Sequence, residues 1–187
     1  MSSETAITRT QPARRARGVV FLLVITVAGS CRFSADDAPQ LATYYVALDG
    51  DNAGSGSIEE PFGTIQYAID RCRAGDTVVV RGGTYYQPKP LQIGTSGASY
   101  AWITIRAYTG ERPIVDGGSY SEDTSCVILA GDYIVFSGFE VRHSPRGGVT
   151  VWGASHVVVH DNVVHDCQRA GIYVGYNAMS KMRDVVI

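Results

Sequence analysis

The sequence predicts an all-β fold: a right-handed parallel β-helix with three short strands per coil and coils of ~23 residues. Three observations predict it. Short runs of Val and Ile, punctuated by Gly, Asn and Asp, fill the chain after residue 76. Two neighbouring stretches repeat at a fixed offset, and an amphipathic segment of helical pattern precedes the first run. Each run is too short to bury its apolar face alone, so stacked coils must supply the core.

Residues 1–31 are interpreted as an export signal outside the fold. Three arginines between residues 14 and 17 precede the apolar run 19–27, and Ala28-Gly29-Ser30 then leads to Cys31. A membrane-spanning helix needs ~20 apolar residues, so the shorter run indicates a signal peptide. AGS-Cys31 resembles a bacterial lipoprotein box, although such boxes usually carry Leu where Ala28 stands. Lipidation of Cys31 and ordinary cleavage are both open. The predicted location is secreted, periplasmic or at the outer cell surface, with membrane anchoring if Cys31 is lipidated.

Composition narrows the function classes. The 187 residues are 45% hydrophobic and carry a formal net charge of −2. This hydrophobic fraction is enough for a core, and the small negative charge offers no basic surface for nucleic acid. We therefore expect no nucleic-acid partner. We also expect a monomer. Beyond Cys31, the cysteines Cys72, Cys126 and Cys167 are odd in number, which permits one disulfide and a free thiol with the pairing open. Small buried hydrophobic side chains are the simpler interpretation for at least two of them.

The segments before the coils follow in a clear order. Residues 32–43 are a small, polar tether, and 44–76 are expected to hold a strand, a turn-rich loop and a capping helix. The helix is predicted over 64–73, with Thr64 as its cap. Its apolar positions fall on one face at helical spacing: Ile65, Ala68, Ile69 and Cys72. The coils then occupy 77–187.

The internal repeat is the main evidence for a solenoid. Residues 133–153 (YIVFSGFEVRHSPRGGVTVWG) align without gaps on 156–176 (HVVVHDNVVHDCQRAGIYVGY). Apolar runs fall on apolar runs, and Gly138 falls on Asp161, as expected where a turn needs positive φ. Leucine-rich repeats share this period, but leucine is nearly absent after Leu91. A parallel β-helix therefore fits better.

The segment 44–86 (YYVALDGDNAGSGSIEEPFGTIQYAIDRCRAGDTVVVRGGTYY) resembles the start of secreted pectate-lyase-like β-helix proteins. The order of strand, glycine-rich loop, "PF.TIQ.A" helix and "GDTV.VR.GTY" is similar to family 9 polysaccharide lyases and their uncharacterised relatives. The resemblance spans residues 44–187 and implies that the helix covers the N-terminal end of the solenoid. It also implies an acidic polysaccharide as partner and Ca²⁺ as cofactor, although the acidic calcium cluster of those lyases is not recognisable in these coils. Fold transfers across such a resemblance better than function does.

The number of coils suggests a shortened protein. About four coils can be counted, which at ~4.8 Å per coil rise by ~20 Å. The run Val185-Val186-Ile187 would leave an unpaired strand edge, which natural proteins avoid. We therefore expect a β-helix truncated at its C-terminus.

Stacking converts the repeat offset into predicted contacts. Arg146 is expected on Arg169, in the loop before a strand whose face forms the sugar groove in the similar enzymes. Two stacked arginines favour an acidic sugar as guest, and the alternative that both spread into water stays open. The predicted substrate-binding residues are Arg146, Trp152, Tyr173 and Tyr176.

Elimination from a uronate requires neutralisation of the carboxylate, a base for the C5 proton and a proton for the leaving oxygen. Lys181, in a lengthened loop, and Arg169 are the candidate catalytic residues. The segment HDNVVHD (160–166) makes Asp166 the candidate metal ligand, and stacking predicts His143 with Asp166 as a base and its orienting partner.

The preferred function is Ca²⁺-assisted β-elimination on a uronate-containing polysaccharide such as pectate. The first alternative is a non-catalytic carbohydrate-binding or surface β-helix protein. The second is a glycoside hydrolase or uronate epimerase on the same fold, for which paired carboxylates on adjacent coils would be the sign of a hydrolase.

Overall fold

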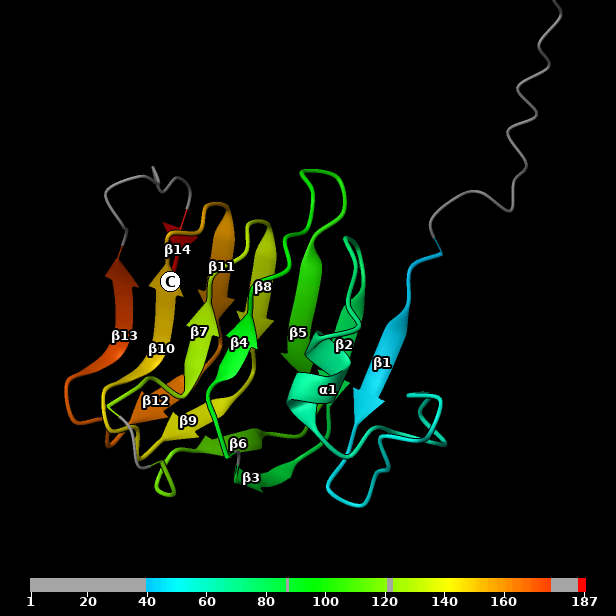
Figure 1. Cartoon of the computed structure of the whole chain (residues 1–187), viewed down its shortest axis with the longest axis horizontal. Coiled ribbons are helices and arrows are strands. Elements are labelled where there is room, and N and C mark those ends of the chain that lie inside the picture. Colours follow the sequence, from blue (N-terminus) through cyan, green and yellow to red (C-terminus); the bar gives the residue numbers. More distant parts are fainter. Residues whose placement is uncertain (1–39, 87, 121–122, 176–184) are drawn as a thin grey trace, which may run out of the picture. The chain divides into compact units, whose positions relative to one another are not determined.

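The computed structural model describes residues 40–86, 88–120, 123–175 and 185–187. These residues form a solenoid of parallel strands with one short helix, and Figure 1 shows the strands stacked in three sheets. The all-β, parallel β-helix prediction is confirmed. The predicted signal segment 1–31 and most of the tether 32–43 lie outside the described residues. No helix within the described ranges is both long and apolar enough to span a bilayer.

All strand pairs within the three sheets are parallel. The first sheet runs β1 (Thr43–Val46), β2 (Thr77–Val80), β5 (Ile103–Ala107), β8 (Ile134–Ser137), β11 (Val157–His160) and β14 (Val185–Val186). The second runs β4 (Leu91–Ile93), β7 (Val127–Leu129), β10 (Gly147–Trp152) and β13 (Ala170–Gly175). The third runs β3 (Gly83–Tyr86), β6 (Pro113–Asp116), β9 (Glu140–Arg142) and β12 (Val163–His165).

The register confirms the repeat on all three sides of the last two complete coils. Val157 pairs with Ile134, Val164 with Val141 and Ile172 with Val149, and each pair is separated by the predicted repeat offset. The two earlier coils are longer because loops lie between their strands. Ile134 pairs with Ile103, for example, across a wider separation in the sequence. The strands therefore stack as uniformly as the repeat predicts, although the sequence spacing between them varies.

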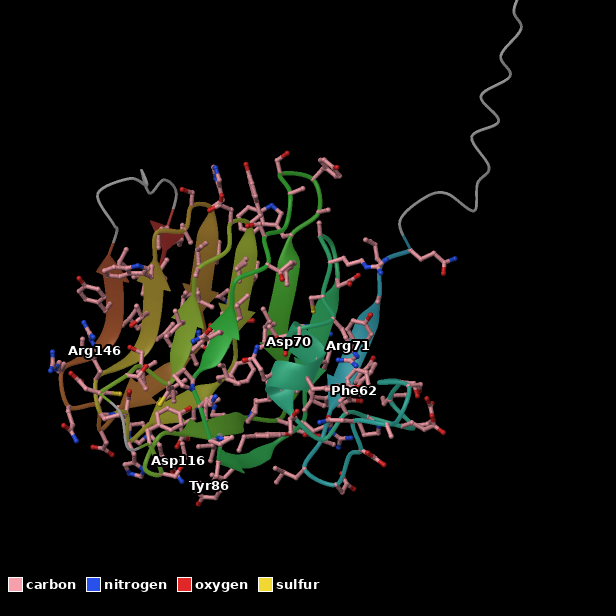
Figure 2. All side chains as sticks on the ribbon, viewed as in Figure 1. Phe62, Asp70, Arg71, Tyr86, Asp116 and Arg146 are labelled. Carbon is pink, nitrogen blue, oxygen red and sulfur yellow. The ribbon has the colours of Figure 1, made fainter. Side chains whose placement is uncertain are left out.

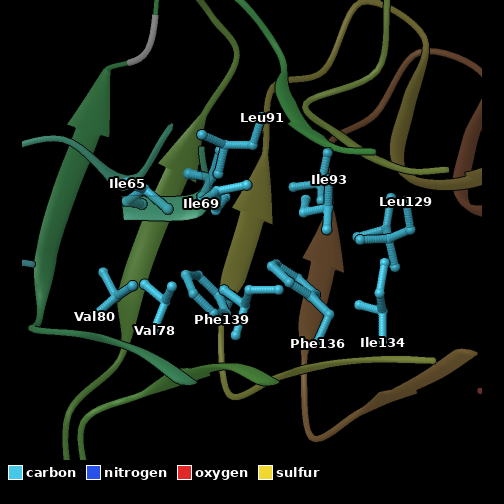
Figure 3. Packing of buried hydrophobic residues seen from close by; sticks show 14 of the residues in the cluster. Ile65, Ile69, Val78, Val80, Leu91, Ile93, Leu129, Ile134, Phe136 and Phe139 are labelled. Atoms are coloured by element: carbon cyan, nitrogen blue, oxygen red, sulfur yellow. The ribbon is translucent and has the colours of Figure 1, made fainter. Parts of the chain in front are cut away.

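The core is a stack of inward-facing aliphatic and aromatic side chains (Figure 3). Phe136 and Phe139 stack with ring centroids 4.5 Å apart and planes 15° from parallel. Ile105, Phe136 and Val159 lie in register on successive coils, and all are buried. Each coil thus covers the inward-facing apolar side chains of the coil before it. This stacking supplies the burial that the short strands cannot achieve alone.

The helix is shorter than predicted and is not capped by Thr64. α1 covers only Ile65–Ile69, and the Thr64 side chain makes no capping bond. Asn52 instead holds the residues that lead into the helix, because its Oδ1 accepts hydrogen bonds from the backbone N–H of Gly63 (3.0 Å) and Thr64 (3.1 Å). After Ile69 the chain turns with tighter bonds between residues three apart. The predicted apolar face is nevertheless confirmed, because all four of its side chains are buried.

Helix α1 lies at the start of the solenoid, beside β1, β2 and β4, as the resemblance implied (Figure 1). Gln66 joins it to the first strand of the second sheet. Its Nε2 donates to the carbonyl of Gln92 (3.0 Å), and its Oε1 accepts from the N–H of Gln92 (2.8 Å). One side-chain amide thus makes the two bonds that a further strand would make with β4.

The corners between sheets contain the expected left-handed turns. Gly138 has φ 84° and Asp161, its counterpart one coil later, has φ 56°. Asn162 follows and bridges two coils, since its Oδ1 accepts from the N–H of Phe139 (2.9 Å) and its Nδ2 donates to the carbonyl of Phe136 (3.0 Å). Cys72 and Cys126 are buried free thiols, as the simpler interpretation predicted, and Cys167 is free and partly exposed.

Close stacking makes Gly148 intolerant of a side chain. A Cβ there would overlap Val164 and lie 2.8 Å from the carbonyl oxygen of Gly171. We expect Gly148→Ala to lower the free energy of unfolding by about 1–3 kcal/mol, as overpacking does. Gly94→Ala is the matched control, because nothing lies within 4 Å of a Cβ at that position. Thermal melts of both variants test this, and equal melting temperatures would contradict it.

Candidate functional site

The outer face of the β4–β7–β10–β13 sheet presents a column of side chains in register. Gln92 pairs with Ile128, Ile128 with Thr150, and Thr150 with Tyr173. In β4, β7 and β10 their neighbours along the strand are buried, so the alternation of a strand places this column outside. It runs along the solenoid axis and carries no ionised group.

A hollow of about 530 Å³ lies on this face toward β10 and β13. Four of the predicted site residues line it: Arg146, Trp152, Arg169 and Tyr173. Figure 2 places Arg146 where the chain enters β10. The structure therefore brings together every predicted groove residue that it describes. Tyr176 and Lys181, the other two, lie outside the described residues, as does Cys31. We call this hollow the arginine groove.

Two aromatic rings form one wall of the arginine groove. Trp152 and Tyr173 stack with centroids 6.4 Å apart and planes 23° from parallel. They are 41% and 46% exposed, which is high for large rings on a packed sheet. Exposed, roughly parallel rings offer the apolar face that the C–H side of a sugar can cover.

The two arginines stack through their backbones, as predicted. The N–H of Arg169 donates to the carbonyl of Arg146 (2.9 Å). Their side chains differ in environment, because Arg169 Nη2 lies 2.6 Å from Asp123 Oδ2, whereas the Arg146 guanidinium pairs with no side chain among the described residues. The sequence left two arrangements open for these arginines: an acidic group beside them, or both side chains in water. In the structure an acidic group is present, and it is the Asp123 carboxylate of the chain itself.

Sequence reasoning missed several polar residues of this face. Asp123 stands two repeat offsets before Arg169 in the sequence, but β7 and β10 pair at an offset one residue shorter than the repeat, so the repeat alone misplaces Asp123 by one position. Thr150 is bonded to Ser125, with 2.7 Å between the two hydroxyl oxygens. Lys89 lines an adjoining hollow of about 520 Å³ that extends toward α1. Only the lengths of the earlier loops place Lys89 there, and no local pattern marks it.

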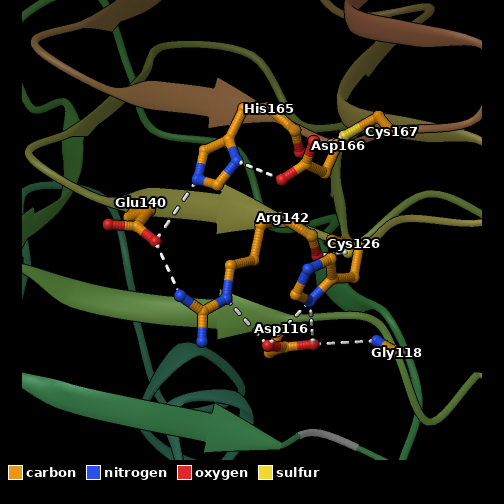
Figure 4. Close-up of polar contacts among 9 residues, drawn as sticks. Asp116, Gly118, Cys126, Glu140, Arg142, His165, Asp166 and Cys167 are labelled. Carbon is orange, nitrogen blue, oxygen red and sulfur yellow. Dashed lines mark hydrogen bonds and ion pairs between the residues drawn. The ribbon is translucent and has the colours of Figure 1, made fainter.

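A second cluster of charges covers the β3–β6–β9–β12 sheet (Figure 4). Asp116, Arg142 and His165 lie in register on successive coils. Arg142 donates to Asp116 Oδ2 (2.8 Å) and to Glu140 Oε1 (3.0 Å), and His165 Nε2 lies 3.3 Å from the same Glu140 oxygen. We call this set the charge ladder. Arg142 and His165 pair in register at the same offset as the repeat.

The charge ladder shifts the ionisation of its ends in opposite directions. Burial opposes ionisation of Asp116, but hydrogen bonds from Arg142, the Gly118 N–H and His143 outweigh it and hold its pKa below the usual value. Hydrogen bonds to Asp166 and then Glu140 raise the pKa of His165. The stability from Asp116 is thus present above pH ~4 and lost as pH falls through its folded pKa. That from His165 is present below pH ~6.5 and lost as pH rises through its folded pKa.

The predicted pairing of His143 with Asp166 is wrong. His143 Nδ1 lies 3.1 Å from both oxygens of Asp116, and Asp166 Oδ2 instead bonds to His165 Nδ1 at 2.8 Å. His143 finds in Asp116 a buried carboxylate already fixed by Arg142, whereas Asp166 is exposed beside its own neighbour. In the described ranges, no three His, Cys, Asp or Glu side chains gather in a way that could hold a metal ion, so Asp166 has no partner ligands there.

Comparison with known proteins gives a family match over most of the chain. The family model described as the Pel9A-like, right-handed beta helix region matches residues 44–185. Pectate lyase PEL9 of Emericella nidulans is 43% identical over 76 residues, which are 41% of this chain and 18% of that protein. The chain therefore spans less than a fifth of that relative's length.

Solved structures share the fold at low sequence identity. The crystal structure of pectate lyase Pel9A has a TM-score of 0.61 at 24% identity, covering 73% of this chain and 36% of that one. A GH136 lacto-N-biosidase from Eubacterium ramulus has a TM-score of 0.57 at 20% identity, covering 77% and 33%. These likenesses concern the fold, and the two neighbours carry different activities on it.

The charge ladder predicts a pH-dependent contribution to stability. We expect Asp116→Asn to lower the melting temperature at pH 7, because Arg142 and His143 lose an ionised partner. The difference from the unaltered protein should begin to shrink below pH ~4, where the unfolded chain takes up the proton, and should vanish as pH falls through the lowered folded pKa of Asp116. Melts from pH 7 to pH 2 measure it, with Asp161→Asn as control because that exposed carboxylate, among the described residues, bonds to His160 and not to the charge ladder. A difference that stays constant with pH would refute the assignment.

Proposed function

The chain belongs to the Pel9A-like right-handed β-helix family, and on this premise we propose that it binds a uronate-containing polysaccharide in the arginine groove. We propose further that it acts on this ligand as a polysaccharide lyase. The observation that carries the proposal is the meeting of two arginines with two stacked, exposed aromatic rings in one hollow. Guanidinium groups recognise carboxylates, and aromatic rings accept sugar faces.

The groove suits a carboxylate-bearing sugar better than a neutral one. Arg146 and Arg169 begin adjacent rungs of the sheet, which are ~4.8 Å apart, so their guanidinium groups can reach one carboxylate together. No Asp or Glu is among the described residues that line this hollow. Its local charge is therefore positive on a chain whose net charge is −2.

In the proposed β-elimination, the carboxylate at C6 is first neutralised, which acidifies the proton on C5. A base then removes that proton, the C4–O bond breaks, a C4=C5 double bond forms, and the leaving oxygen takes up a proton. Arg169 is proposed to neutralise the carboxylate, a role supported by its position in the lining of the arginine groove. Lys181, which lies outside the described residues, is the proposed base, and its pKa must be lowered for that role.

Dependence on Ca²⁺ is a separate part of the proposal. The resemblance to family 9 lyases is its only support, because the described residues do not assemble a set of oxygen ligands. Asp166 remains the proposed ligand of this chain, and its carboxylate is 67% exposed. No step above depends on the ion.

A non-catalytic carbohydrate-binding protein is the second candidate. The exposed Trp152 and Tyr173 rings favour it, because they provide binding without any chemical step. A hydrolase would use two carboxylates flanking the scissile bond, and the described lining of the arginine groove offers none. We also propose export through residues 1–31, with Cys31 as the lipidated residue, which labelling of expressed protein with a fatty-acid analogue would test.

Binding is tested by variants of the groove. We expect Arg146→Gln to weaken binding of trigalacturonate by about tenfold, since a hydrogen bond to a charged group contributes about 1.5 kcal/mol or more. Trp152→Ala should weaken binding of acidic and neutral oligosaccharides alike. Tyr86→Ala is the control, because Tyr86 is an exposed aromatic on another sheet. Titration calorimetry measures each, and unchanged affinity in both groove variants would exclude this hollow as the site.

Turnover is tested by absorbance of unsaturated uronate. We expect product from polygalacturonate or alginate with Ca²⁺, none with EDTA and none from a neutral glycan. Lys181→Ala should abolish turnover and leave trigalacturonate binding intact. Saturable binding without turnover on any substrate would instead support the binding protein, and neither binding nor turnover would remove both candidates.

A further inference from the structure

We propose that Asp123 is a specificity-determining residue, a carboxylate of the chain that occupies Arg169 until an acidic ligand displaces it. This inference rests on the proposed function of the arginine groove and concerns how that groove selects its ligand.

The contact between Asp123 and Arg169 crosses two coils. Asp123 Oδ2 lies 2.6 Å from Arg169 Nη2, although the two residues are 46 positions apart. Asp123 directly precedes Thr124 and Ser125, which line the arginine groove, but is not itself part of the lining. Its carboxylate therefore reaches Arg169 from the rim of the arginine groove. There it pairs with the same guanidinium group that a bound uronate would use.

Coil stacking explains how this arrangement arises. Arg146 and Arg169 directly precede the paired residues Gly147 and Ala170. The pairing of Val149 with Val127 sets Thr124 opposite Arg146, with Asp123 one residue earlier. One acid and two bases thus share one corner of the solenoid. Because Asp123 pairs with Arg169, the groove offers one occupied and one available guanidinium, with a net charge of about +1 from these three groups at pH 7.

An acidic ligand can separate Asp123 from Arg169. The Arg169 and Asp123 side chains are 61% and 51% exposed, and exposed ion pairs are weak because water solvates both partners well. A uronate carboxylate can replace Asp123 on Arg169 while also contacting Arg146. A neutral sugar offers no such replacement, so it must bind with the pair intact. Asp123 therefore lowers affinity for every acidic ligand by a small factor and leaves neutral ligands unaffected.

Asp123→Asn tests the proposal, with trigalacturonate and its methyl ester as the acidic and neutral probes. We expect the variant to bind trigalacturonate about two- to fivefold more tightly, the range that exposed ion pairs span, and to bind the ester as the unaltered protein does. Asp161→Asn removes the same charge at the corner between β11 and β12, whereas Arg169 lies at the corner between β12 and β13. It should leave both affinities unchanged, and an equal gain in both variants would overturn the proposal in favour of long-range attraction.

A double variant identifies the route of the effect. In the Arg169→Gln background, Asp123→Asn should give no gain, because the occupied guanidinium is absent. A gain that persists there would overturn the proposal. If the unaltered protein binds trigalacturonate but Asp123→Asn binds it no better, Asp123 orients Arg169 and the inference fails alone. If the unaltered protein binds neither probe, the proposed function of the groove fails first.

Discussion

The structure depends on in-register stacking of coil upon coil. Strands of two to six residues would not persist alone, and each is stable because parallel neighbours complete its hydrogen bonds and cover its apolar side chains. Phe136 illustrates this, since it lies in register between Ile105 and Val159 and is fully buried. The same constraint aligns outward-facing residues, and so it creates both the arginine groove and the charge ladder without any dedicated loop.

Because stacking governs both faces, the repeat predicted much of the site. The offset between the last complete coils predicted Arg146 beside Arg169, and the structure confirms it. The same offset separates Arg142 from His165, which also pair in register. These predictions needed only a period and the geometry of a strand, which are properties of the local sequence.

The remaining features depend on contacts that a period does not encode. The pairing of His143 with Asp116 depends on a buried carboxylate in a coil of different length, which no fixed offset reaches. Helix α1 ends early, and the residues that lead into it are held by Asn52 from an earlier part of the loop. In each case several partners lie near one side chain, and burial and existing bonds decide which of them it contacts.

The bonds between Gln66 and Gln92 also give the solenoid a direction of growth. A ribosome delivers this end first, so the exposed backbone of β4 is satisfied by a neighbour only 26 residues away before later coils exist. Each new coil then finds a finished template on one side only. In the β4–β7–β10–β13 sheet, a nascent chain built in this order presents only its growing edge, which limits the opportunity for two unfinished molecules to join through this sheet.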